Sequence, residues 1–159
     1  MSVKKEFIEK LKKHATENED HAIVVASQGG KAAIKLAEEL GKGAKIITIS
    51  EFSYSDAVKK VMKKQKIEAV ENADLPLQEL REMRETLLMF DSGIKAALEV
   101  ASIAASKGMV MGKYVAVAGT GKGIDTAVVV NTPHPEKESI SEPLKRLKIE
   151  RIIASPLIL

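Results

Sequence analysis

A short apolar segment followed by a turn with two glycines constrains the fold of this chain more than any other feature. His21-Ala22-Ile23-Val24-Val25-Ala26 lacks polar alternation after its first residue, which is typical of a strand buried on both faces. Ser27-Gln28-Gly29-Gly30-Lys31 follows at once. A helical pattern then runs over residues 30–41 until Gly41 or Gly43 ends it. A buried strand that passes directly into a helix indicates an α/β fold.

Further helices and strands alternate along the chain. Apolar spacing predicts a helix over residues 3–17 and another that begins at Ser53 or Ser55 and continues to about Lys64. Short apolar runs predict strands at residues 45–49, 67–70, 114–118, 126–130 and 149–154, and residues 131–143 are expected to form an irregular loop. Strands 114–118 and 126–130 lie too close in sequence for a parallel crossover and should be antiparallel. We therefore expect a single domain over residues 1–159, a three-layer α/β/α sandwich with an antiparallel hairpin at one end.

Residues 77–107 carry a long helical pattern that is interrupted by Asp91-Ser92-Gly93. The pattern fits either one kinked helix or two helices. We favour two helices, with Asp91 or Ser92 capping the second, because cap residues followed by a helical pattern mark a helix start.

Composition narrows the classes of function. The 159 residues carry a net charge of +3 with lysines and glutamates interspersed, and only 3% of them are aromatic, so no nucleic-acid surface is expected. The absence of cysteine excludes disulfides and thiolate sites. No segment has the length of a membrane span and the N-terminus lacks an apolar signal core, so we expect a cytoplasmic protein that does not contact a membrane.

The first glycine turn has the chemistry of an anion site. Ser27 can cap the helix that follows, and the paired glycines leave backbone N–H groups accessible to a ligand. Lys31 falls in the first helical turn, where the helix dipole disfavours a cation, and the first acids of that helix are Glu38 and Glu39. An anion between Lys31 and the helix end would remove this conflict. Alternatively, the turn is simply tight and Lys31 is solvated.

A second glycine loop, Gly119-Thr120-Gly121-Lys122-Gly123, joins the two antiparallel strands. It is not a P-loop, because neither Ser nor Thr follows Lys122 and a strand follows instead of a helix. Taken alone, it fits a permissive hairpin turn equally well. If the strands at 22–26 and 114–118 are neighbours, however, both loops leave the carboxyl edge of the sheet at a topological switch point. Ligands of open α/β sheets bind there. Lysines and the hydroxyls of Ser27, Thr120 and Thr126 would then converge on one pocket.

These segments resemble a known family. Residues 23–33 and 114–130 are similar to the two signature segments of a small archaeal family whose fold is like the C-terminal domain of pyruvate kinase. Leu88 through Glu99 resembles the central helical segment of that family, and Arg151 through Pro156 its end. The resemblance implies the sheet order 3-2-1-4-5 with strand 5 antiparallel. In pyruvate kinase the corresponding loops hold the phosphates of an allosteric sugar bisphosphate, and members of the archaeal family hold flavin mononucleotide (FMN).

Carried over to this chain, the resemblance implies two sets of binding residues. The phosphate would lie on Ser27, Gln28, Gly29, Gly30 and Lys31. The rest of the ligand would be lined by Gly119, Thr120, Gly121, Lys122, Gly123, Asp125 and Thr126, with Asp125 accepting from a hydroxyl group. Between strand 3 and the central helices only residues 71–76 stand in place of a longer family loop, so any flavin contact from that loop is missing. Pyruvate kinase activity is not implied, because the catalytic barrel of that enzyme is absent.

Other residues have plainer expected roles. The histidines are expected at the surface and no metal site is expected: His14, His21 and His134. The following methionines are expected to fill gaps in the core or an interface: Met62, Met83, Met89, Met109 and Met111. The following lysines are expected on a solvated face: Lys59, Lys60, Lys63, Lys64 and Lys66. Pro156-Leu157-Ile158-Leu159 would pack either on the core or on a second subunit.

Three functions remain open from the sequence. The first is a binding module for a phosphorylated small molecule, with FMN the first candidate, acting as a sensor or regulatory unit. The second is a flavin-dependent or phosphoryl-handling enzyme, for which only Asp125, Lys31 and Lys122 offer acid–base groups, Asp125 being the only acid expected beside the pocket. The third is a structural subunit of an oligomer whose glycine loops bind nothing.

Overall fold

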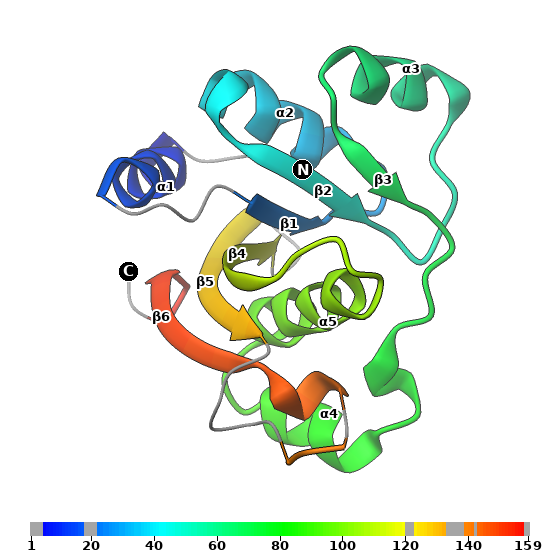
Figure 1. Cartoon of the computed structure of the whole chain (residues 1–159), viewed down its shortest axis with the longest axis vertical. Helices are drawn as coiled ribbons and strands as arrows, with labels where there is room; N and C mark the ends of the chain where they lie inside the picture. The colour runs from blue at the N-terminus through cyan, green and yellow to red at the C-terminus, as the bar shows by residue number, and fades with distance from the viewer. Residues whose placement is uncertain (1–4, 18–21, 120–122, 133–138, 142, 158–159) are drawn as a thin grey trace.

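The computed structural model contains a sheet of six strands in the order β3-β2-β1-β4-β5-β6 (Figure 1). The structure describes residues 5–17, 22–119, 123–132, 139–141 and 143–157. The strands are β1 (Ala22–Ala26), β2 (Lys45–Ile49), β3 (Glu68–Val70), β4 (Gly112–Gly119), β5 (Ile124–Thr132) and β6 (Lys148–Ala154). Strand β1 is parallel to β2 and β4, and β2 is parallel to β3. Strand β5 is antiparallel to both β4 and β6, so the sheet is mixed and has one strand beyond the five of the implied order.

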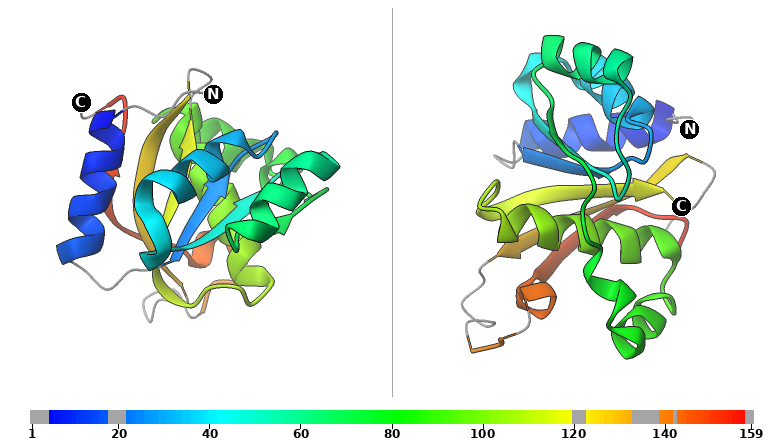
Figure 2. Two further views of the ribbon diagram at one scale, coloured as in Figure 1. Left: turned by 90° about the horizontal axis from the view of Figure 1, so that it is seen from above. Right: turned by 90° about the vertical axis from the view of Figure 1, so that its right-hand side faces the viewer.

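Helices cover both faces of the sheet (Figure 2). The helices are α1 (Lys5–Glu17), α2 (Lys31–Leu40), α3 (Asp56–Lys64), α4 (Arg81–Leu87) and α5 (Ser92–Ser106). Short 3-10 turns in the described residues accompany them: η1 (Gly41–Gly43), η2 (Pro76–Gln78) and η4 (Pro143–Arg146). Helices α1, α2 and α3 contribute to the core on one face, whereas α5, η2 and η4 contribute to the core on the other. The α/β class expected from the sequence is confirmed.

The side chains of β1 show why an uninterrupted apolar run was needed. Ile23 and Val25 belong to the core under α1, α2 and α3, whereas Val24 belongs to the core under α5. All three are buried, since alternate residues of a strand point to opposite faces. Tyr114 and Val115 of β4 divide between the two cores in the same way.

Two side-chain caps set the helix starts that the sequence left open. The Ser55 hydroxyl accepts a hydrogen bond from the Val58 N–H at 3.2 Å and begins α3. The Asp91 carboxylate accepts from the Ile94 N–H at 2.7 Å and begins α5. Residues 77–107 therefore form two helices, as favoured, and Asp91 rather than Ser92 is the cap.

Several surface and core predictions need correction. His14 is 3% exposed, not at the surface, because it follows Phe7 and Leu11 on the buried face of α1. Met62 fills the core as expected, whereas Met89 and Met111 are 83% and 84% exposed and do not fill the core, and their place in an interface stays a prediction. Met89 lies in the turn after α4, a helix with no buried residue, and Met111 lies just before β4.

The remaining surface predictions have mixed outcomes. The five lysines of the predicted solvated face are all exposed: Lys59, Lys60, Lys63, Lys64 and Lys66. Leu157 is exposed, whereas Ile158, Leu159, His21 and His134 lie outside the described residues. Within the described ranges, no helix is long and apolar enough to cross a membrane.

Candidate functional site

A cleft of about 420 Å³ lies at the carboxyl edge of the sheet, where β1 and β4 are neighbours. Ser27 and Gln28, which follow β1, line it together with Gly119 at the end of β4. The rest of this carboxyl-edge cleft is lined by Ala26, Ile49, Ser50, Glu51, Leu75, Lys95, Ala96, Glu99 and Val100. The first residues of both glycine loops thus meet in one cleft at the switch point of the sheet.

The turn after β1 is held by hydrogen bonds from the end of β2. The Ser27 N–H donates to the Ile49 carbonyl at 3.2 Å, and the Ser50 hydroxyl donates to the Gln28 carbonyl at 3.2 Å. These contacts hold the backbone of the turn, while Gln28 and Gly29 are exposed to solvent.

Tyr54 supports the same turn from below. Its hydroxyl donates to the Ser27 carbonyl oxygen at 2.8 Å and lies 2.8 Å from Thr48 Oγ1. Because the Tyr54 proton is used for Ser27, the Thr48 hydroxyl is the donor in the second contact. Burial raises the pKa of Tyr54 to about 12, and the nearby Glu71 adds to this, although the Thr48 bond opposes it. The phenol therefore stays protonated and keeps its donor role at neutral pH.

The start of α2 differs from the expected cap. Gly30, with φ +86°, occupies the N-cap position, and the Ser27 hydroxyl accepts from the Gly30 N–H at 3.1 Å instead of capping the helix. Helix α2 begins at Lys31, so Gly30 and not Ser27 is the residue next to the first helical N–H groups. Lys31 is the first residue of α2, and that first turn contains no acid.

Gly30 also packs against α3 at close range. A Cβ at this position would lie 2.7 Å from Val58 Cγ1 and would overlap Met62 Cε. At neighbouring Gly29 an added Cβ would meet nothing within 4 Å. The two glycines therefore have different roles, since Gly30 is required by packing and backbone conformation and Gly29 leaves space above the turn.

Only part of the second glycine loop can be placed. Thr120, Gly121 and Lys122 lie outside the described residues. Gly119 and Gly123 approach each other so closely that a Cβ on Gly119 would overlap the Gly123 carbonyl oxygen. Thr126 is fully buried and donates to Asp125 Oδ1 at 2.9 Å.

Several predicted binding residues do not line the carboxyl-edge cleft. They are Gly29, Gly30, Lys31, Gly123, Asp125 and Thr126. Lys31 is exposed at the start of α2, next to the turn that contributes Ser27 and Gln28. The expectation that these residues contact a ligand stays a prediction.

The sequence analysis missed an ion pair on the cleft wall. Lys95 Nζ lies 3.0 Å from Glu99 Oε1, and the side chains of Lys95 and Glu99 are 25% and 2% exposed. The other oxygen, Glu99 Oε2, accepts from the Leu77 N–H at 3.2 Å. This backbone bond and the lysine together stabilise a carboxylate that burial alone would disfavour.

A second carboxylate, that of Glu51, also lines the cleft and accepts from Gln78 Nε2 at 3.2 Å. The expectation that Asp125 is the only acid beside the pocket is therefore wrong. The physical reason is that Glu51 follows β2 and Glu99 belongs to α5, and the fold brings both to the cleft from positions far in sequence from either glycine loop. The spacing of Lys95 and Glu99 in the sequence predicts an i,i+4 ion pair on a helix, but it does not predict that the pair is buried.

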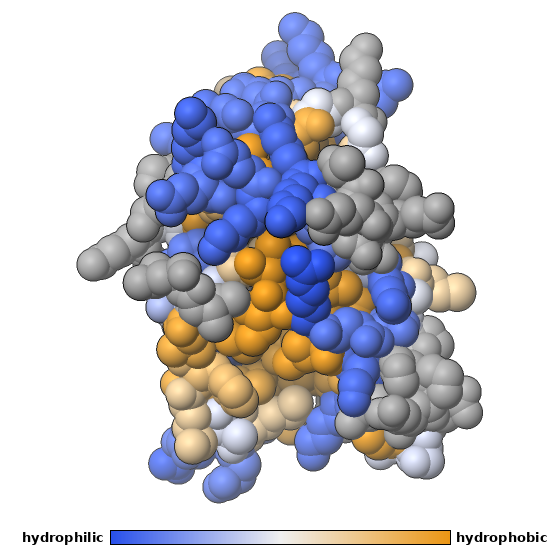
Figure 3. All heavy atoms as spheres, turned by 90° about the vertical axis from the view of Figure 1, so that its left-hand side faces the viewer, coloured by the Kyte–Doolittle hydropathy of each residue, from blue (hydrophilic) through white to orange (hydrophobic). Residues whose placement is uncertain are grey.

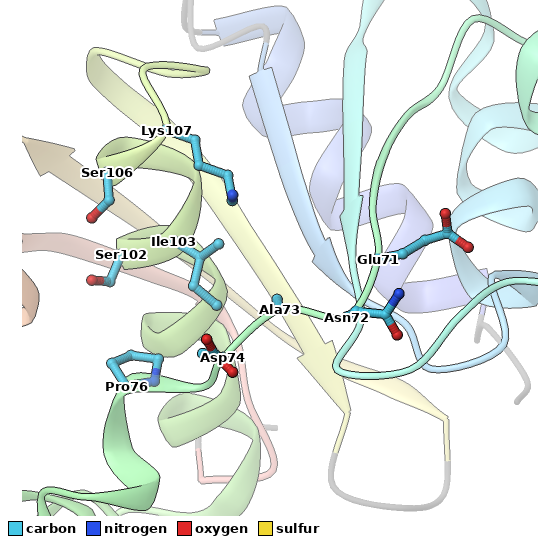
Figure 4. A pocket seen from close by; sticks show the side chains of 9 residues that line it. All are labelled: Glu71, Asn72, Ala73, Asp74, Pro76, Ser102, Ile103, Ser106 and Lys107. Carbon is cyan, nitrogen blue, oxygen red and sulfur yellow. The ribbon is translucent and has the colours of Figure 1, made fainter.

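A second cavity of about 350 Å³ lies farther along α5 (Figure 4). Ile103 of α5 and Lys107, the residue after it, extend toward the segment that carries Ala73 and Asp74 (Figure 4). None of the predicted binding residues lines it. Among the described residues, no group of three or more His, Cys, Asp and Glu side chains is arranged to hold a metal ion.

Comparison with known proteins identifies no family for this chain. No protein-family model matches it, and no curated protein sequence gives a significant match.

Proposed function

We propose that the carboxyl-edge cleft and the adjoining start of α2 bind a phosphate-bearing small molecule, with FMN the first candidate. The observation that carries this proposal is the meeting of Ser27, Gln28 and Gly119 in one cleft at the switch point between β1 and β4. Glycine-containing turns at this position of a sheet expose backbone N–H groups to a ligand.

The charge at the start of α2 supports an anionic ligand group. The first N–H groups of a helix have no intrahelical acceptor, and the helix dipole makes this end electropositive. Lys31 adds a full positive charge there, and no acid in the first turn compensates it. A phosphate group would accept from the N–H groups and neutralise Lys31 at the same time.

The polar groups of the cleft wall support a ligand that also carries hydroxyl groups. Glu51 and Glu99 offer carboxylate acceptors, and Lys95 offers a donor. A ribityl or sugar chain next to a phosphate has hydroxyls that suit both kinds of group.

The described lining residues include no aromatic side chain, so stacking on a flavin ring would require a residue at the rim. Phe52, which follows Glu51 and is 52% exposed, is the candidate for that role.

We further propose that the fold is of the kind found in the C-terminal domain of pyruvate kinase. The order β3-β2-β1-β4-β5, with β5 antiparallel, supports this likeness, and β6 is an addition to it. On this proposal the chain acts as a sensor or regulatory module rather than as a kinase.

The proposal is tested on freshly purified full-length protein. An absorption spectrum would reveal a retained flavin, and thermal unfolding would be followed with FMN, with a sugar phosphate and with the matching unphosphorylated compounds. A ligand at a hundred times its Kd should add about 2.7 kcal/mol to the free energy of unfolding. A colourless protein that no phosphorylated compound stabilises would contradict the proposal.

A further inference from the structure

The two parts of the proposed ligand site carry charges of opposite sign. At the start of α2, Lys31 lies at the electropositive end of the helix, and the first turn contains no acid. The charged residues among the described lining of the carboxyl-edge cleft are Glu51, Lys95 and Glu99, one cation against two carboxylates. A ligand that occupies both parts therefore meets a positive end and a net negative wall.

The charge of Lys95 is already compensated within the wall. Lys95 Nζ lies 3.0 Å from Glu99 Oε1, and the Glu99 side chain is nearly buried. Because the two opposite charges are in contact, the pair adds little net charge to the cleft. The remaining N–H groups of Lys95 can donate to a ligand hydroxyl, but the pair offers no excess positive charge to a second anionic group.

Glu51 keeps its charge uncompensated. Its carboxylate accepts from Gln78 Nε2 at 3.2 Å, and this amide donor is neutral. Glu51 forms no ion pair with any residue that the structure describes. The negative charge of the cleft wall is therefore the charge of Glu51.

The backbone next to Glu51 is held in place and is tied to the glycine turn. The Ser50 N–H donates to the Val70 carbonyl at 3.0 Å, and the Phe52 N–H donates to Ser50 Oγ at 2.9 Å. The same Ser50 hydroxyl donates to the Gln28 carbonyl at 3.2 Å. The segment that carries Glu51 therefore has a defined position relative to the turn at which the phosphate is proposed to bind.

We propose that Glu51 is a specificity-determining residue of this site, which selects phosphate monoesters whose other end is uncharged or cationic and disfavours ligands with a second anionic group. This inference rests on the proposed function, because it concerns the ligand of the same site. A carboxylate accepts from a hydroxyl group and attracts an ammonium group, whereas it repels a carboxylate or a second phosphate. FMN belongs to the selected class, because its ribityl chain and its ring are uncharged.

The test compares three sugar phosphates of similar size that differ in the charge away from the phosphate. Glucosamine 6-phosphate carries an ammonium group, glucose 6-phosphate carries no further charge, and 6-phosphogluconate carries a carboxylate. Calorimetric titration of the full chain near neutral pH and at low salt measures each Kd. Relative to glucose 6-phosphate, the wild type should bind glucosamine 6-phosphate about threefold more tightly and 6-phosphogluconate about threefold more weakly.

Glu51→Gln removes the charge and keeps a side chain of nearly the same size. In this variant both ratios of Kd should move toward one, because the wall no longer distinguishes the ligands by charge. Circular dichroism would confirm that the variant keeps the fold.

The matched control is Glu9→Gln on the exposed face of α1, which removes the same charge from the chain. Figure 3 shows the side of the molecule on which α1 lies in Figure 1, where apolar residues gather below a broad hydrophilic area. No described residue of α1 lines the carboxyl-edge cleft. Glu9→Gln should therefore keep the wild-type ratios of Kd.

The outcomes separate this inference from the proposed function. Equal affinities of the wild type for the three compounds, or tightest binding of 6-phosphogluconate, would overturn the role of Glu51 and still support a phosphate site. Wild-type ratios that persist in Glu51→Gln would overturn it as well. If none of the three compounds binds, the inference fails, and the proposed function fails with it only if FMN does not bind either.

Discussion

The Tyr54 hydroxyl donates a hydrogen bond of 2.8 Å to the Ser27 carbonyl oxygen, so a buried side chain before α3 holds the first residue of the glycine turn. Because Thr48 of β2 contacts the same hydroxyl, the turn after β1 is tied to its neighbouring strand through one phenol. We regard Tyr54 as the main positioning residue of the turn.

Removing this hydroxyl should loosen the turn and destabilise the protein. Tyr54→Phe leaves the Ser27 carbonyl and the Thr48 hydroxyl without their buried partner, at a cost of about 1–3 kcal/mol. Urea unfolding of the two proteins measures the difference. Equal stability would show that the hydrogen bond contributes nothing to the fold.

The raised pKa of Tyr54 predicts a loss of stability at high pH. The phenol ionises near pH 10 in the unfolded chain and near 12 in the folded protein, so its contribution is complete below pH 10 and decreases as the pH rises toward 12. The free energy of unfolding of the wild type should therefore decrease relative to that of Tyr54→Phe between pH 10 and 12. Tyr114, whose pKa burial also raises, is present in both proteins and cancels in the comparison. Parallel pH profiles would contradict the assignment.

The two glycines of the first turn should differ in tolerance to substitution. Gly30→Ala introduces a Cβ that overlaps Met62 and crowds Val58 at a positive φ, and should cost about 1–3 kcal/mol. Gly29→Ala introduces a Cβ with nothing within 4 Å and should change stability by less than about 0.5 kcal/mol. Thermal unfolding compares them directly, and equal losses would be inconsistent with the packing of α3 on Gly30.

The Lys95–Glu99 pair should contribute more to stability than a surface pair of the same spacing. Lys95→Met leaves the nearly buried Glu99 carboxylate without its cation and should cost about 3 kcal/mol, and the double variant K95M/E99Q should recover much of this loss. The matched control is Lys35→Met, which breaks the exposed Lys35–Glu39 pair and should cost less than about 0.5 kcal/mol. Similar costs for Lys95→Met and Lys35→Met would mean that Glu99 does not need its partner.

Phe52 distinguishes flavin from a sugar phosphate as the ligand. If the flavin ring stacks on Phe52 at the rim of the cleft, Phe52→Ala should weaken FMN binding by about fivefold and leave sugar phosphate binding unchanged. Phe90 is exposed to a similar degree, 53%, but it lies in the turn after α4 and not, like Phe52, directly beside a residue that lines the cleft, so Phe90→Ala is the control. Quenching of flavin fluorescence measures the affinity. Equal FMN affinities of the two variants would show that the flavin ring does not stack on Phe52.

The local elements of this fold could be predicted from the sequence. Strand β1 and the start of α2 follow from an apolar run and a glycine turn, and β2 was predicted at its observed bounds, residues 45–49. The burial of His14 could also have been predicted, because His14 continues the helical spacing of Phe7 and Leu11.

The composition of the cleft wall could not be predicted in the same way. Glu51, Lys95 and Glu99 reach the cleft only because β2 and α5 end or begin at the carboxyl edge, which depends on the packing of α5 across β1 and β4. In sequence, Lys95 and Glu99 are an ordinary helical pair. The conformation of Gly30 could not be predicted either. It depends on the packing of α3, whose residues lie about thirty positions later in the chain.

The most direct test of the central claim, that this site recognises a phosphate group, is a calorimetric titration of the full chain with FMN and with riboflavin, which differ only in the phosphate. A phosphate held by the start of α2 and the turn after β1 should give FMN a Kd at least about tenfold lower than that of riboflavin, equivalent to about 1.4 kcal/mol. The same ratio is expected for a sugar phosphate against its sugar if the ligand is not a flavin. Equal affinities within each pair, or no binding of either phosphorylated compound, would contradict the account.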